Sequence, residues 1–197
     1  MKVVHLNASD KGGASIVAQR LNEALNAYTD VNSHHLIFSG NSKGLLETTF
    51  WANSPLKKIR AFLNHALDKF DFLQYERNAE IRFQFNHARM GIDISHHPLI
   101  KEADIIHIHW LNQGFIKFGS LSKINKPLVW TMRDMWAFTG GSHYTMDFQK
   151  YEKSYVSKLI QAFKKRNYKK NFHFVAISDW LKNKAQNSNV LKEYKVE

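Results

Sequence analysis

The order of elements at the N-terminus constrains the fold of this chain more than any other feature. Residues 2–7 read KVVHLN, a short β-forming run, and Gly12-Gly13 follow after a polar loop. Apolar side chains then recur every three or four positions and predict an amphipathic helix over about residues 14–27. Its expected apolar face comprises Ala14, Val17, Leu21, Ala24, Leu25 and Tyr28. A strand, a glycine turn and a helix in this order open a doubly wound α/β fold.

The same alternation continues to the end of the chain. Further strands are expected at residues 33–39, 103–110, 128–132 and 172–177, and further helices at residues 55–70, at 153–170 and from 179 onward. The apolar stripe of the helix at 55–70 predicts packing against the sheet or a partner, or binding at a membrane surface. The pattern therefore predicts a Rossmann-like α/β fold with a mostly parallel sheet flanked by helices, as a single domain over residues 1–197.

Composition narrows the class of protein. Hydrophobic residues make up 44% of the 197 residues, enough for a sizeable core. The absence of cysteine excludes disulfides and thiolate metal ligands, and it fits a reducing compartment. The apolar run after Met1 is too short for a signal peptide, and no run reaches the roughly 20 residues that span a bilayer. We expect a soluble, cytoplasmic protein.

The charge balance indicates a negatively charged partner. The formal net charge is +11, with 28 basic against 17 acidic residues. Nucleic acid, an anionic membrane face and a phosphorylated substrate all fit this excess, but the chain has no recognised nucleic-acid-binding motif. Basic residues are densest at residues 150–170. They predict either a surface that binds an anionic partner or simply a solvent-exposed helix face. Four of them are expected to contact an anionic membrane surface: Lys164, Lys165, Lys169 and Lys170.

Two short motifs carry weak chemical signals. Gly12-Gly13 would present backbone N–H groups and a helix N-terminus to an anion. The chain has neither GxGxxG nor GxxxxGK[ST], so positive φ alone also explains the glycines. His107 and His109 lie two apart in a strand and share a face, but no third cluster of metal ligands accompanies them, so no metal site is expected. His109, at the strand's C-terminal end, is well placed for a ligand.

The stretch at residues 129–147 has the local pattern of a functional loop. It reads VWTMRDMWAFTGGSHYTMD: a β-forming run meets Arg133-Asp134, then Gly140-Gly141, then His143-Tyr144. A strand that ends in charged, glycine-rich and aromatic residues is typical of a site at the edge of a sheet.

Four ordered segments together resemble a known family. They are HLNASDKGGAS at 5–15, ADIIHIHW at 103–110, VWTMRDMWAFTGGSHY at 129–144 and FVAISDWL at 174–181. The set resembles the N-terminal domain of retaining family 4 glycosyltransferases of the GT-B type, particularly bacterial enzymes of surface-polysaccharide synthesis. The resemblance implies the acceptor-side half of a two-domain enzyme, with the nucleotide-sugar domain and its Glu-x7-Glu motif absent from this chain. It also implies a nucleotide-sugar donor, a saccharide or lipid-linked acceptor, no separate cofactor, and a location in the cytoplasm or at the inner face of the membrane.

The resemblance also assigns roles residue by residue. Gly12 and Gly13 match the loop that approaches the donor diphosphate and sugar, and Arg133-Asp134 stand at the catalytic His-Asp pair. Acceptor-side positions are His109, Trp110, Gly140, Gly141, His143 and Tyr144. Arg133 departs from the family's histidine, and an arginine cannot act as a neutral acceptor or as a base near pH 7. It can bind a phosphate or pair with Asp134.

Three functions remain open from the sequence. The favoured one is the acceptor-binding half of a glycosyltransferase, with this chain inactive alone because most donors that stabilise the leaving diphosphate would lie in the other half. A non-catalytic carbohydrate- or phosphate-binding module of the same fold is the alternative that Arg133 suggests. A nucleic-acid binder is the least favoured.

Overall fold

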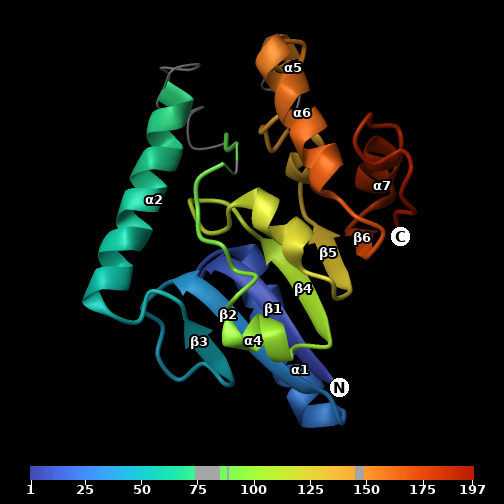
Figure 1. Ribbon diagram of the computed structural model, residues 1–197. Helices are drawn as coiled ribbons and strands as arrows, with labels where there is room; N and C mark the ends of the chain where they lie inside the picture. The colour runs from blue at the N-terminus through green and yellow to red at the C-terminus, as the bar shows by residue number, and fades with distance from the viewer. Residues whose placement is uncertain (74–84, 88, 145–148) are drawn as a thin grey trace.

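The computed structural model describes residues 1–73, 85–87, 89–144 and 149–197, and it places a single parallel sheet at the centre (Figure 1). The sheet is six-stranded in the order β3-β2-β1-β4-β5-β6, and every neighbouring pair is parallel. The strands are β1 Lys2–Ser9, β2 Asn32–Ser39, β3 Thr48–Phe50, β4 Ile105–Trp110, β5 Leu128–Met132 and β6 Phe172–Ala176. The predicted α/β, Rossmann-like class is confirmed. Of the six strands in this sheet, the three-residue β3 is the one that the sequence analysis did not predict.

Helices connect the strands as a doubly wound fold requires. They are α1 Gly13–Tyr28, α2 Pro55–Leu73, α4 Pro98–Glu102, α5 Gln149–Glu152, α6 Tyr155–Asn167 and α7 Asp179–Gln186, with short 3₁₀ turns η1 Phe118–Lys123 and η2 Trp136–Phe138. Ser178 caps α7 by accepting from the Leu181 amide, as its position before the helix predicts. Among the described residues, no helix is both long enough and apolar enough to cross a bilayer.

The two faces of the sheet differ in chemistry. Alternate residues along each strand point to one apolar cluster, which contains Leu6, Leu36, Ile108, Trp130 and Phe174 among others. The intervening residues face the other way, and there several are polar and buried: His5, Asn7, Ser33, His35 and His109. Helix α1 packs over β1, β2 and β4.

The prediction that the apolar face of α1 packs on the sheet is wrong, because the sheet surface under α1 is polar. Its buried residues are Ser15, Ala18, Gln19 and Asn22, while Val17 is 43% exposed and Tyr28 is 86% exposed. The sheet beneath presents imidazole and hydroxyl groups that need hydrogen-bond partners once buried. Gln19 Oε1 lies 2.9 Å from His35 Nδ1, and Ser33 Oγ donates to Asn22 Oδ1 over 2.8 Å. The helix therefore turns its polar side toward the sheet.

Candidate functional site

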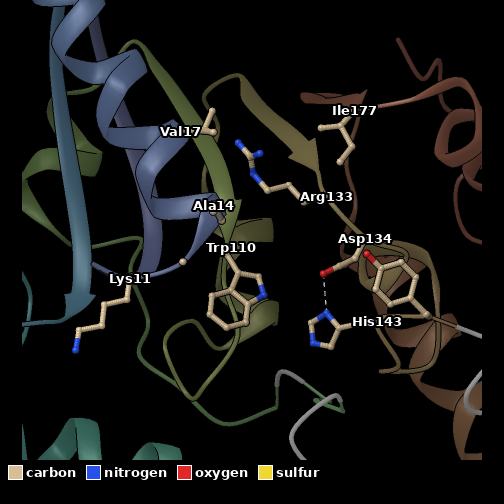
Figure 2. A pocket seen from close by; sticks show the side chains of 11 residues that line it. Lys11, Ala14, Val17, Trp110, Arg133, Asp134, His143 and Ile177 are labelled. Carbon is tan, nitrogen blue, oxygen red and sulfur yellow. Dashed lines mark hydrogen bonds and ion pairs between the residues drawn. The ribbon is translucent and has the colours of Figure 1, made fainter.

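A cavity of about 820 Å³ opens beside the carboxyl ends of β1, β4, β5 and β6. The strand order reverses between β1 and β4, and this is where ligands bind in open α/β sheets. Eleven residues line the cavity: Lys11, Gly12, Gly13, Ala14, Val17, Trp110, Arg133, Asp134, His143, Tyr144 and Ile177. Figure 2 shows Trp110, Arg133 and His143 directed into this space from three different segments. Seven residues singled out from the sequence thus meet in one place.

The N-terminus of α1 faces the cavity without a cap. Gly12 adopts φ 88, no side chain caps the helix, and its first turn has no acidic residue. A Cβ built at Gly13 would meet no atom within 4 Å, so packing does not require a glycine there. Exposed Lys11 lies next to these glycines. Free amides at a helix N-terminus with open space before them suit an anion.

Arg133 brings a positive charge to the same cavity from the end of β5. Its guanidinium reaches toward α1 in Figure 2, and Nη2 lies 3.3 Å from His109 Nδ1. Among the described residues no carboxylate lies within ion-pair distance of it, and its Nε is buried without a partner. Arg133 does not pair with Asp134, whose carboxylate accepts from other donors. This guanidinium is therefore available to an anionic ligand.

Asp134 and His143 form an ordered pair on the opposite wall. His143 Nδ1 lies 2.7 Å from Asp134 Oδ2, and the amide of Trp136 donates to Asp134 Oδ1 over 2.9 Å. Asn112 Nδ2 lies 3.1 Å from His143 Nε2. With Asn112 donating, His143 donates Nδ1–H to the carboxylate, so both ring nitrogens are occupied. Asn112 was not singled out from the sequence, where only its place after Trp110 hinted at the site.

A chain of buried hydrogen bonds supports Arg133 from below. Because a guanidinium can only donate, His109 Nδ1 accepts and His109 Nε2–H donates to His5 Nδ1 over 3.2 Å. His5 Nε2–H then donates to Ser33 Oγ over 3.0 Å, and Ser33 donates to Asn22 on α1. Burial lowers the pKa of His5 to about 3 and also depresses the pKa of His109, so both rings are neutral. Each member thus has one consistent proton position.

The same histidines are the candidate metal ligands of the described part of the chain. Ligand atoms of His5, His107 and His109 lie within 4.8 Å of one another. A metal on His109 Nε2 would leave the ring proton on Nδ1, where it would face the N–H donors of Arg133. His107 Nε2 also lies 2.8 Å from Thr131 Oγ1. The arrangement fits a neutral hydrogen-bonded chain better than a cation site.

Three predicted acceptor-side residues lie outside the cavity lining. His109 is 3% exposed and sits under Arg133. Gly140 and Gly141 are buried; a Cβ at Gly140 would overlap Ser157 of α6, and Gly141 adopts φ 129 against Asn86. Close packing and positive φ therefore account for both glycines. Residues 145–147 of the predicted loop lie outside the described residues.

The expected membrane contact of Lys164 is wrong. Lys164 is fully buried, and its ammonium donates to the carbonyl oxygens of Trp136 and Thr139 over 2.5 and 3.1 Å. It also lies 3.5 Å from the centroid of the Trp136 ring. Its role is to hold η2 in place beside the site. Lys165 pairs with Glu193 over 2.6 Å, and only Lys169 and Lys170 of the four are exposed.

Comparison with known proteins gives one distant relative. Over 144 residues, 68% of this chain, the sequence is 28% identical to a protein of Escherichia coli (strain K12) described as "Putative colanic acid biosynthesis glycosyl transferase WcaC". The match spans 33% of that protein, so this chain corresponds to about a third of its length. No family model matches, and no solved structure matches significantly. The similarity supports a relationship to glycosyl transferases of polysaccharide biosynthesis, and it does not distinguish among their families.

Proposed function

We propose that this chain is the acceptor-side half of a retaining glycosyltransferase of the GT-B type. The enzyme would move a sugar from a nucleotide-sugar to a polysaccharide or lipid-linked acceptor. The proposal rests on one observation above all: an uncapped helix N-terminus and an arginine without a carboxylate partner meet in a cavity of about 820 Å³. Such a site suits the diphosphate of a nucleotide-sugar.

Each wall of the cavity would have its own task. The amides at Gly12 and Gly13 and the Arg133 guanidinium would hold the diphosphate. When the bond from the anomeric carbon to the phosphate oxygen breaks, negative charge builds up on the leaving diphosphate, and fixed N–H donors stabilise it. This would make Arg133 a catalytic residue although it cannot act as a base.

The opposite wall would receive the acceptor. Trp110 and the exposed Tyr144 offer aromatic surface and a hydroxyl group to a saccharide. Since both ring nitrogens of His143 are already hydrogen-bonded, His143 and Asp134 would position this wall rather than remove the acceptor's proton. A lipid-linked acceptor would further place the enzyme at the cytoplasmic face of a membrane.

The test uses the full-length protein and a panel of nucleotide-sugars, with release of nucleoside diphosphate as the readout. Arg133→Gln should lower kcat/KM by about 100-fold, the size expected for loss of one transition-state donor. Arg20→Gln, exposed on α1 and outside the cavity lining, is the matched control and should behave as wild type. Tight binding of a nucleotide-sugar without turnover at any acceptor would instead support the non-catalytic carbohydrate-binding alternative.

A further inference from the structure

Helix α2 presents its apolar side to solvent. Six large apolar side chains along it are about half or more exposed: Leu56 80%, Ile59 57%, Phe62 71%, Leu63 51%, Leu67 48% and Phe70 65%. We call this set the α2 stripe. Between Leu56 and Phe70 it extends for about 20 Å at the helical rise of 1.5 Å per residue. An exposed apolar surface of this size marks a site of interaction.

The polar side of α2 faces the domain and holds this orientation. Ala61 and Asp68 are buried, and Asn86 donates a hydrogen bond to the Asp68 carboxylate. Gly114, at φ 72, lies so close to α2 that a Cβ there would come within 2.6 Å of the Asn64 backbone. The stripe therefore faces outward because the opposite side of the helix is tightly packed.

Basic residues border the α2 stripe on both sides. At about 100° per residue, Arg60 falls along one edge, next to Leu67, and Lys58 and Lys69 fall along the other, next to Phe62. The one carboxylate between residues 55 and 70 is that of Asp68, on the buried side. Over residues 55–70, apolar side chains with flanking bases and no exposed acid match the pattern of a helix that lies in the interface of a membrane.

We infer that the α2 stripe is the surface that docks this protein onto an anionic lipid bilayer. The inference takes up the membrane location in the proposed function, but it depends on no residue of the cavity. The apolar side chains would enter the boundary between headgroups and acyl chains, while Lys58, Arg60 and Lys69 would lie at the level of anionic headgroups. Figure 1 shows α2 on the side of the molecule away from α5 and α6, so the exposed bases of residues 165–170 are not part of this surface.

The charges disfavour a second copy of the chain as the occupant. Two α2 stripes packed against each other would bring Lys58, Arg60 and Lys69 of one copy close to the same bases of the other. Over residues 55–70 the one carboxylate, that of Asp68, is buried and does not neutralise Lys58 or Arg60. Like charges brought together at an interface oppose association, whereas anionic headgroups supply the complementary charge.

Flotation of the full-length protein with vesicles tests the inference. The probes are vesicles of phosphatidylethanolamine with phosphatidylglycerol and vesicles of phosphatidylcholine alone. Wild type should bind the anionic vesicles and bind the neutral ones much less. The triple variant Phe62→Gln, Leu63→Gln, Phe70→Gln should lower the partition coefficient by about tenfold or more, since three apolar side chains no longer enter the bilayer.

Two matched variants on α6 and the following loop control for general effects. Tyr155→Gln with Leu159→Gln changes apolar side chains that are 75% and 51% exposed on the other side of the molecule, and binding should stay as in wild type. Lys169→Glu with Lys170→Glu should have less effect than Lys58→Glu with Arg60→Glu. All replaced side chains are exposed, so circular dichroism and thermal unfolding should match wild type.

Several outcomes would overturn the inference. One is wild-type protein that stays off anionic vesicles; another is a triple variant that floats as well as wild type. Loss of binding with Lys169→Glu and Lys170→Glu, but not with the α2 variants, would move the membrane surface to the other side. A dimer in solution that dissociates in the triple variant would assign the stripe to a second copy. Nucleoside diphosphate release from a soluble donor does not involve α2, so failure of the proposed transfer would leave the vesicle result intact.

Discussion

At the scale of single residues, the site depends on what each polar group already contacts. Asp134 accepts from His143 and from the Trp136 amide, which leaves Arg133 without a carboxylate. Arg133 is instead held by a neutral imidazole, His109, which fixes its direction and does not cancel its charge. The substitution of arginine for the expected histidine thus adds a cation to the cavity.

Lys164 yields a prediction about stability and pH. Burial lowers its pKa to about 7, while Glu152 and Asp134 act in the opposite direction. An unfolded chain holds that proton up to about pH 10.4. Between these pH values the unfolded state binds more protons, so the free energy of unfolding rises with pH. Lys164→Met should remove this rise, measured by urea unfolding at about pH 7 and about pH 10 and compared with exposed Lys169→Met. Parallel stability profiles for wild type and Lys164→Met would contradict the prediction.

At the scale of elements, α1 and the sheet enclose a polar layer rather than an apolar one. His5, His35 and His107 lie in it and are hydrogen-bonded to Ser33, Gln19 and Thr131 respectively. Desolvation lowers the pKa of His5 to about 3 and that of His35 and His107 to about 4. The packing of α1 therefore requires neutral imidazoles.

This layer should make the fold sensitive to acid. Below about pH 6.5 the unfolded chain takes up protons that the folded histidines do not, so stability falls as the pH drops toward about 4. Each such histidine contributes up to about 1.4 kcal/mol per pH unit. The slope of unfolding free energy against pH measures how many more protons the unfolded state binds. His35→Gln should lower this number by up to one. His173→Gln, at an exposed position of β6, is the matched control. An unaltered slope in His35→Gln would mean that His35 is not neutral in the fold.

At the scale of the whole molecule, the cavity is walled by residues at the carboxyl edge of the sheet and is open on the opposite side. Its lining residues come from the carboxyl end of β4, from the loops that follow β1, β5 and β6, and from the start of α1, and it opens to solvent at that edge of the sheet. Donors that stabilise a leaving diphosphate work best in a site from which water is excluded. If the chain is the acceptor-side half proposed above, efficient transfer requires a second wall that covers this opening.

Under the proposed function, residues 1–197 alone and the full-length protein should differ greatly in the rate of nucleoside diphosphate release. The isolated chain should release nucleoside diphosphate from nucleotide-sugars at no more than the background rate, while the full-length protein turns over. The measurement is made at equal concentration, with circular dichroism to verify that the isolated chain is folded. Equal rates would show that this half alone suffices.

The order of strands and helices and the parallel sheet followed from the sequence by itself. Periodicity of two or of three to four residues is a local property, and alternating strands and helices leave few arrangements other than a doubly wound sheet. The same order brought Gly12, Trp110 and Arg133 to one edge, because parallel strands end together.

Only the tertiary structure decided which side of each helix faces inward. An apolar stripe is expected to face the core, yet α1 turns its polar side to the histidines of the sheet and α2 turns its polar side to the domain at Gly114. Which face is buried depends on the chemistry of the opposing surface, which comes from residues distant in sequence. The burial of Lys164 and the contact of Asn112 with His143 have the same cause. Local pattern determines elements, and the complementarity of distant surfaces determines their orientation.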